Sequence, residues 1–503
     1  MKLFLLVAAL ATVAVSAPAQ DGAAQSAQQS GPAEESQSTD DSGAADDLFS
    51  DPFAEAEGSD EEDDLSLDDL DSLFEDEDMI DEVEADGETA PETDLLVREN
   101  TRIGGRFSTS FESLSTWAEY PAWEDLATPS QALLVPTIAA RIFVDARPED
   151  DFRFYARFDL DYPFSVEANG ADGGEVAVPS IEVFELFSDF SWNETLFFRI
   201  GKSVVNWGVG YFFSPADVIS LTPIDPEDPE VDREGPVSFR TQLPFDVHNA
   251  YFYVVAGETI ADDGEIDVVE LTVAPKLELF FAGVEYGLGA FYQKDLSPRA
   301  MATISTSIWD FDLFGEGVVS YGSDRVFIRE TDDPFVPWET YTDDESLFFQ
   351  GTGGFRYSNT DLDASVIAQY YYNGEGYTDP ELIGHALGTV VLVETGLLPA
   401  ATIDERGGDI GVADLTRASP HYATVVASLS EVFGTDLSAG LLWQGNLSDG
   451  SGLVAPSLTY RLFERGSITA QTTIAYGPDD REFTNLGARM SASLSVSLGS
   501  GSF

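Results

Sequence analysis

The chain has 503 residues, of which 92 are acidic and only 24 are Lys or Arg, so its formal net charge at pH 7 is -68. It has no cysteine, which excludes disulfide bonds and thiolate sites. Such an excess of acid also argues against nucleic acid as a partner, because phosphate contacts need Lys and Arg.

Residues 1–19 have the parts of a secretory signal peptide. Lys2 supplies the positive start, an apolar run follows from Leu3 to Val15, and Ala17-Pro18-Ala19 suits a cleavage site. The apolar run is too short to cross a bilayer, and no cysteine follows it that could carry a lipid anchor. The sequence therefore predicts an exported chain from which this segment is removed.

The segment 20–97 contains 29 acidic residues and no Lys or Arg. Its Ala, Ser, Gln and Gly content cannot bury enough apolar surface to fold alone, so we expect a disordered acidic extension in the periplasm. The favoured interpretation is a solvated tether. The apolar residues of Asp71-Ser72-Leu73-Phe74 leave open a motif that folds when it docks on a partner.

From Arg98 to Phe503 the chain repeats segments of about ten residues with alternating polarity, separated by turns. In Phe152–Leu160, for example, three phenylalanines alternate with Arg153, Tyr155, Arg157 and Asp159. There are 17 or 18 such segments. An even number is expected for a barrel with both termini on one side, so the sequence favours 18 strands and leaves 16 open.

Connection lengths give independent support for a barrel in an outer membrane. Short connections such as 310–312 and 358–361 alternate with long ones such as 322–346 and 373–420. The long loop 373–420 contains the apolar run Leu382–Leu398, which we expect to pack inside the barrel mouth.

The stretch Leu196–Arg240 begins as a strand and then opens into a long loop, assigned here to 208–244, that is rich in Pro and acid. Ser214-Pro215-Ala216-Asp217 has the residues of a helix start. Gly201 precedes Trp207-Gly208 in a G-x-x-x-x-x-W-G segment, which resembles the end of an early strand in outer-membrane β-barrels of the porin type.

The carboxyl terminus resembles the terminal strand of such barrels. Leu494, Val496 and Leu498 alternate with serine, and the chain ends in Phe503. The resemblance implies that Phe503 is an assembly signal read by the barrel-assembly machinery, although Gly499–Ser502 interrupts the alternation before it. Homotrimers are common among porin-like proteins, but the sequence leaves the oligomeric state open.

A set of arginines is the main candidate for a functional site. The alternation places six of them on the inward face: Arg102, Arg106, Arg141, Arg153, Arg157 and Arg199. The loop supplies opposite charge through Asp217, Asp225 and Asp228, and such facing charges would form a constriction that tunes a pore. Alternatively, the arginines pair with Asp145, Asp159, Glu182 and Glu185 and simply fill a polar interior.

Other chemistry has little support. The three histidines, His248, His385 and His421, lack a metal-ligand partner at close spacing, so no enzyme, metal site or cofactor is predicted. A Ca²⁺ site in 225–232 is a weaker alternative to a solvated acidic loop.

The sequence thus predicts an all-β transmembrane barrel of 16–18 antiparallel strands over residues 98–503, in contact with outer-membrane lipid. The expected function is passive diffusion of small hydrophilic solutes through a porin-like channel. The alternative is a non-conducting structural or adhesive barrel whose acidic tail recruits a periplasmic partner. The sequence leaves the solute and the ion selectivity undetermined.

Overall fold

The computed structural model describes residues 100–149, 151–162, 181–193, 195–220, 224–227, 229, 231–256, 271–333, 336–360, 362–394, 397–399, 401–404, 406–408, 410–463, 465–479, 481–485 and 488–502. The expected signal peptide (1–19) and acidic extension (20–97) lie outside these residues, as do Asp228 and Phe503.

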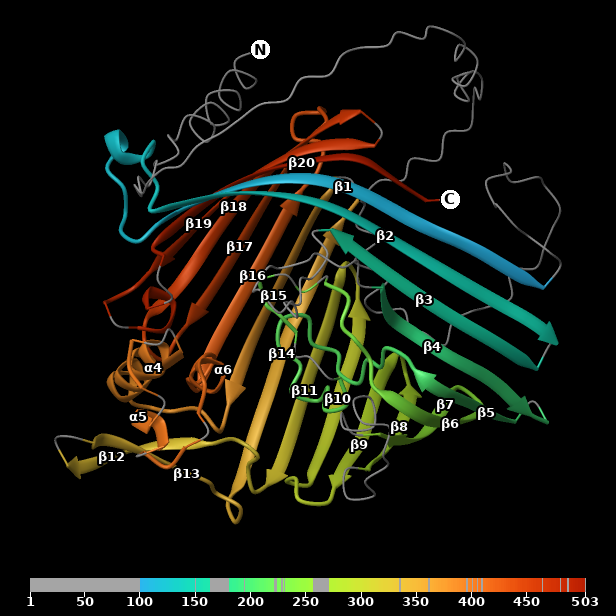
Figure 1. The fold of residues 1–503 in the computed structure, drawn as a ribbon. Helices are drawn as coiled ribbons and strands as arrows, with labels where there is room; N and C mark the ends of the chain where they lie inside the picture. The colour runs from blue at the N-terminus through green and yellow to red at the C-terminus, as the bar shows by residue number, and fades with distance from the viewer. Residues whose placement is uncertain are drawn as a thin grey trace, which may run out of the picture. The chain divides into compact units, whose positions relative to one another are not determined.

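Eighteen antiparallel strands form one closed sheet, which confirms the prediction of an all-β antiparallel barrel and selects 18 over 16 strands (Figure 1). Each strand pairs with the next barrel strand in sequence, and β1 closes the barrel on β20. The strands are β1 (Thr101–Trp117), β2 (Gln131–Glu149), β3 (Phe152–Tyr162), β4 (Ile181–Trp192), β5 (Leu196–Lys202), β6 (Val237–Phe245), β7 (His248–Val255), β8 (Thr272–Phe281), β9 (Val284–Gln293), β10 (Arg299–Ile308), β11 (Phe311–Tyr321), β14 (Leu347–Asn359), β15 (Ala364–Asn373), β16 (His421–Leu429), β17 (Leu437–Asn446), β18 (Ser451–Phe463), β19 (Gly466–Tyr476) and β20 (Met490–Ser502).

The two faces of the barrel differ as alternation requires, because directly paired residues lie on the same side of a sheet. Away from the strand ends, the outward side chains in the described strands are apolar, small or hydroxyl-bearing, and many large ones are exposed, such as Phe107, Ile138 and Leu288. The inward side chains include the charged ones. A wall that is apolar outside and polar inside suits a barrel surrounded by lipid.

The connections alternate in length as predicted. The turns that follow β2, β4, β6 and β8 are short, whereas the connections that follow β1, β3, β5, β11 and β15 are long. Because β1 begins and β20 ends at the rim with the short turns, the long loops gather at the opposite rim.

Two sequence assignments around the long loop are wrong. The loop assigned to 208–244 contains strand β6 (Val237–Phe245), so the actual connection between β5 and β6 is 203–236. Leu243-Pro244 read as loop because proline interrupts strands, yet Pro244 pairs with Asn249 at the end of the β6–β7 hairpin. The expected helix start at Ser214–Asp217 is a turn, closed by the N–H of Asp217 donating to the carbonyl of Ser214.

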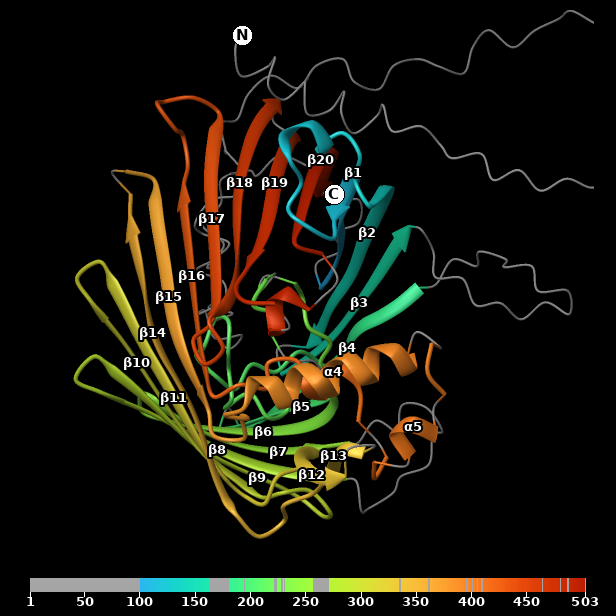
Figure 2. The same ribbon diagram turned by 90° about the vertical axis from the view of Figure 1, so that its left-hand side faces the viewer.

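The long loops between β11 and β14 and between β15 and β16 build a small cap at their rim (Figure 2). The first contributes the hairpin of β12 (Phe327–Asp333) and β13 (Val336–Tyr341), and the second contributes α4 (Pro380–Glu394), α5 (Ala401–Asp404) and α6 (Val412–Leu415). The apolar run predicted to pack at the mouth forms most of α4, which buries Leu387 and Val390 against Trp338 of β13.

No helix among the described residues is long and apolar enough to cross a lipid bilayer.

Candidate functional site

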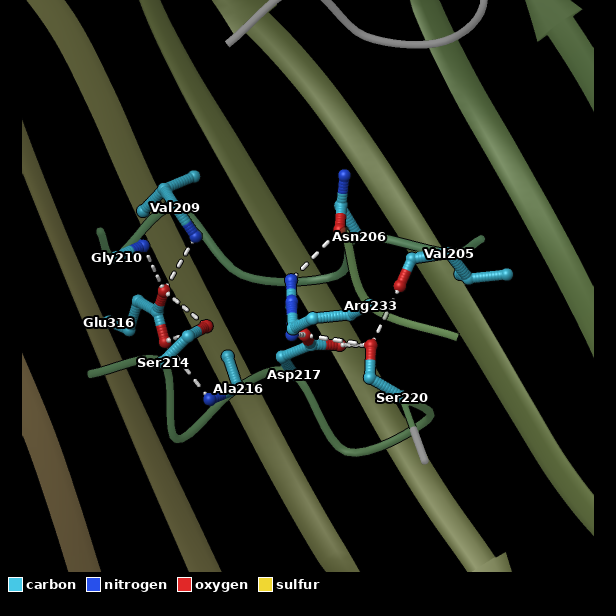
Figure 3. A network of polar contacts seen from close by, with 10 residues as sticks. All are labelled: Val205, Asn206, Val209, Gly210, Ser214, Ala216, Asp217, Ser220, Arg233 and Glu316. Carbon is cyan, nitrogen blue, oxygen red and sulfur yellow. Dashed lines mark hydrogen bonds and ion pairs between the residues drawn. The ribbon is translucent and has the colours of Figure 1, made fainter. Parts of the chain in front are cut away.

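The connection 203–236, called the inner loop below, folds into the barrel and lies within the ring of strands in Figures 1 and 2. The carboxylate of Glu316, on the inward face of β11, holds one part of it (Figure 3). Glu316 Oε1 accepts the backbone N–H groups of Val209 (2.5 Å) and Gly210 (2.6 Å), and Oε2 accepts that of Ala216 (2.9 Å). The Ser214 hydroxyl also donates to this carboxylate, at 3.0 Å. One buried side chain thus satisfies four donors of a segment without regular structure.

Glycine is needed where the loop approaches this carboxylate. A Cβ on Gly208 would lie 2.5 Å from Glu316 Oε1, and a Cβ on Gly210 would lie 2.2 Å from the Phe213 carbonyl oxygen. Any larger residue would therefore push the backbone away from Glu316. The glycine of the Trp207-Gly208 pair noted in the sequence is accordingly explained by the close approach of the loop backbone to Glu316.

Gln369, on the inward face of β15, holds the next part of the loop. Its Oε1 accepts the backbone N–H groups of Tyr211 (3.1 Å) and Phe212 (2.8 Å), and its Nε2 donates to the carbonyl of Phe213 (2.6 Å). The Phe213 ring stacks on Tyr371, with centroids 5.0 Å apart. The loop thus reaches from β5 across the lumen to β15.

Apolar packing fixes the loop against the wall between these points. Trp207 and Ile219 are buried in a cluster with inward side chains of β7 to β11: Tyr251, Tyr253, Val255, Ala274, Phe291, Met301 and Val318. Trp207 meets Tyr253 edge to face, with centroids 5.5 Å apart. Burial of a large apolar side chain stabilises the folded state by about 1.5–3 kcal/mol, so this cluster holds the inner loop firmly against the barrel wall.

Polar contacts also tie the inner loop to itself (Figure 3). The guanidinium of Arg233 forms an ion pair with Asp217 and donates to Asn206 Oδ1 at 3.0 Å. Asp217 also accepts the Ser220 hydroxyl at 2.8 Å, and its side chain is only 3% exposed. Asp217, expected in the constriction, therefore joins the two ends of the loop.

The structure brings together four of the six arginines. Arg153 pairs with Asp145 (2.9 Å), Arg199 with Asp189 (2.8 Å) and Arg157 with Asp159 (2.8 Å). Arg141 also contacts Asp159, at 3.4 Å. These wall carboxylates include two that the sequence suggested as partners.

Aromatic rings cover part of the same arginines. The guanidinium of Arg157 lies 3.9 Å from the ring centroid of Phe184, and that of Arg199 lies 4.1 Å from that of Phe187. Since Arg157 and Arg199 are also buried, their charge is largely used in holding the wall together.

Asp232 of the inner loop joins this wall. It accepts from Arg157 at 2.7 Å and also pairs with Arg141. Burial opposes ionisation of Asp232, but the contacts with Arg157 and Arg141 outweigh it and lower the pKa of this carboxyl. The carboxylate therefore stays charged to a lower pH than an ordinary aspartate, which favours attachment of the loop to β2 and β3.

Asp225 lies at a different wall. It pairs with Arg417, from the connection between β15 and β16, at 2.8 Å. Asp225 and Asp232 are thus held by arginines from two different parts of the barrel.

The other two predicted arginines lie outside the ion pairs described above. Arg102 and Arg106 lie on the inward face of β1, opposite Asp145 and Arg141, and both are exposed. Neither makes an ion pair with another described residue. Asp228 and Phe503 lie outside the described residues.

Sequence reasoning missed Glu316, Gln369 and Arg417. Glu316 carried a usable signal, because it is the single acid in the segment Phe314-Gly-Glu-Gly-Val-Val319, where both neighbours are glycine. Gln369 is one polar residue among many on inward faces, and Arg417 lies in a loop without periodicity, so neither could be recognised.

The described residues do not assemble a metal site, since no three His, Asp or Glu side chains among them are placed to share an ion. In the acidic stretch considered for Ca²⁺, Asp225 and Asp232 are both engaged by arginine. The three histidines lie apart, in β7, α4 and β16.

No protein-family model matches the chain, and no curated protein matches its sequence. Among solved structures, the chain is similar to Pseudomonas aeruginosa OccK8 (OprE), with 10% identity and a TM-score of 0.44 over 80% of this chain and 98% of that one. It is also similar to Acinetobacter baumannii OccAB1, with 10% identity and a TM-score of 0.43 over 83% of this chain and 100% of that one. A third similar structure is the outer membrane protein opdK from Pseudomonas aeruginosa, with 9% identity and a TM-score of 0.43 over 80% and 99%. The likeness is distant, and the fold assignment rests on the strand pairing described above.

Proposed function

We propose that this protein is an outer-membrane channel for passive diffusion of small hydrophilic solutes, and that the inner loop narrows its lumen. A closed barrel with an apolar exterior and a polar interior supports the membrane location and the channel. The inner loop supports the constriction, because it is held inside the barrel by Glu316, Gln369, Arg157 and Arg417.

The observation that carries this proposal is an unequal burial of the inward faces. In β7 to β11, the filled sector, the inward side chains Tyr251, Phe291, Met301 and Val318 are buried beneath the inner loop. In β18 to β20 and β1, the open sector, the inward side chains are half-buried or exposed except near the long-loop rim, where Leu453, Ala455 and Ala475 are buried. The half-buried or exposed ones are mainly hydroxyl or amide groups: Ser457, Thr459, Ser467, Thr469, Gln471, Ser493, Ser495, Ser497, Ser108 and Ser110. Solutes would therefore pass between the loop and the open sector.

Single cysteines test this route, since the parent chain has none. We expect Ser495→Cys, in the open sector, to react rapidly with a water-soluble thiol reagent and to lose current when modified. Val318→Cys, in the filled sector, is the matched control and should react slowly without changing the current. Equal reaction of both would reject the route, and a parent barrel that inserts into a bilayer without passing current would reject the channel itself.

A non-conducting surface barrel with a partner-recruiting tail stays the alternative, and the absence of current would favour it. The tail 20–97 lies outside the described residues.

A further inference from the structure

The inner loop is attached at Asp225 by a residue that belongs to the cap, and this attachment is called the far end below. Arg417 lies between α6 and β16, and its guanidinium reaches Asp225 Oδ1 at 2.8 Å and the carbonyl of Ile224 at 3.3 Å. More than 190 residues separate these groups in sequence. At the near end, Arg157 and Arg141 hold Asp232.

Asp225 and Asp232, seven positions apart, are therefore tied to two different parts of the barrel, and the described residues between them are called the chord below. Seven residues of extended chain span at most about 25 Å, which limits how far apart the two attachment points can lie. One edge of the route to the open sector is this chord. Its position depends on both arginine ends, because its described residues, 225–227, 229 and 231–232, form no helix or strand.

Arg417 itself is held firmly. Its backbone N–H donates to Glu482 Oε1 at 2.7 Å, and Glu482 is buried in the connection between β19 and β20. Glu482 Oε2 also accepts the Tyr422 hydroxyl at 2.7 Å and the Asn446 amide at 2.8 Å. The Glu482 carboxylate thus joins the connection that contains Arg417 to the ends of β16 and β17 at the long-loop rim, and the Arg417 side chain extends from this point to the inner loop.

The backbone of Arg417 supports a positioning role. Its φ is +52°, in the left-handed region that is uncommon for residues other than glycine, asparagine and aspartate. Such a conformation is strained and persists where surrounding contacts enforce it. Here the bond to Glu482 fixes the backbone, and the left-handed turn directs the side chain to the inner loop.

From these contacts we propose that Arg417 is a positioning residue for the constriction: it fixes the far end of the inner loop and so sets the width of the route along the open sector. This inference rests on the proposed channel function. It also means that the cap and the constriction are mechanically joined through Glu482 and Arg417, so a displacement of the rim loops moves the edge of the route.

The test compares single-channel conductance of the full-length protein with that of Arg417→Ala. We expect the variant to show larger or more variable conductance, with the same barrel stability in heat-modifiable electrophoresis. The pair is partly exposed, and exposed ion pairs contribute up to about 1 kcal/mol. The population of channels in which this part of the inner loop is detached should therefore rise by no more than about fivefold.

The matched control is Arg489→Ala, which removes another loop arginine with an ion pair, to Asp479 at 2.6 Å, that does not reach the inner loop. It should leave conductance unchanged. Asp225→Asn weakens the same contact from the other side without touching the backbone of Arg417, and should reproduce Arg417→Ala even if that variant folds poorly. Exchanging the charges in Arg417→Asp with Asp225→Arg should restore the parent conductance.

The outcomes separate the two proposals. If the parent conducts and both Arg417→Ala and Asp225→Asn conduct exactly as it does, the positioning role is rejected while the channel stands. If the parent itself carries no current, the channel proposal fails. Equal effects of Arg489→Ala and Arg417→Ala would indicate a general loss of rim charge and would also reject the specific role.

Discussion

The filled and open sectors of the barrel have the same strand geometry but different inward chemistry. In the filled sector the inward side chains buried beneath the inner loop are mainly Tyr, Phe, Met and Val, as in Phe291, Met301 and Val318. In the open sector the inward side chains are mainly Ser, Thr and Gln, as in Ser457, Thr469 and Gln471, and the charged ones of β1 are Arg102, Arg106 and Glu112. An inward face that is apolar therefore marks wall that is covered by protein, whereas an inward face rich in hydroxyls marks wall that meets water.

The largest expected effect comes from removing the anchor in the filled sector. In Glu316→Ala four donors lose their acceptor, and each buried donor left unpaired costs about 1–3 kcal/mol. The loop should detach near Gly210, and conductance and its fluctuations should increase. Planar-bilayer recording measures this directly.

The control for this variant is Glu112→Ala, since Glu112 is an inward glutamate on β1, opposite Ser495 in the open sector. It should leave the loop attached and the fluctuations unchanged. If Glu316→Ala had no larger effect than Glu112→Ala, the filled sector would not depend on this carboxylate.

A smaller effect is expected where the packing of Trp207 is disturbed. A Cβ on Gly289 would lie 3.2 Å from the Trp207 ring and 3.0 Å from Met301, so Gly289→Val should push the indole away from the barrel wall. Overpacking of this kind costs about 1–3 kcal/mol. The midpoint of heat-induced unfolding should fall, and the loop should become more sensitive to protease.

Gly353→Val provides the matched comparison. Gly353 lies on the outward face of β14, and a Cβ there would meet only the Phe314 carbonyl oxygen, at 3.7 Å. A β-branched residue in such a strand should be neutral or slightly stabilising. Equal destabilisation by both variants would show that Trp207 is not tightly packed.

The difference between the two sectors also shows which parts of the structure can be predicted from the sequence. Alternation in Phe152–Leu160 and the serines of 491–497 give the barrel and its faces, because a period of two depends on local residues only. The apolar inward side chains of Tyr251 and Tyr253 could have predicted a covered wall. The loop could not be placed, because Glu316 and Gln369 meet it across more than 100 residues of sequence.

The arginines illustrate the same limit. Their face follows from alternation, yet their partners depend on strand register and on where the loop lies. Asp189 joins Arg199 through the pairing of β4 with β5, and Asp232 joins Arg157 only because the loop folds inward.

A moderate effect of pH is expected at the chord. Burial and the nearby charge of Asp225 raise the pKa of Glu227, although Arg417 opposes the shift. As pH falls, Glu227 should therefore take up a proton above the range of an ordinary glutamate, near 4.3, and the route should lose one negative charge. Reversal potentials in a KCl gradient should shift toward anions over that interval.

Glu227→Gln should remove this step and leave Asp232 ionised, because the pKa of Asp232 is lowered and its charge is lost only in stronger acid. If the pH-dependent shift in reversal potential had the same size and midpoint in Glu227→Gln as in the parent, the titrating group would be a residue other than Glu227.

The smallest effect is expected in the open sector itself. The hydroxyls of Thr459 and Thr469 lie 3.0 Å apart on neighbouring strands, and both side chains are half-buried. Thr469→Val keeps the shape and removes this bond, but water can replace it, so the net cost should stay below about 1.5 kcal/mol. Conductance should hardly change, because in the proposed channel the chord, and not any single hydroxyl, sets the width of the route. A large fall in solute flux with normal ion conductance would instead mean that the hydroxyl wall binds the solute directly, and the open sector would then be a recognition surface as well as a passage.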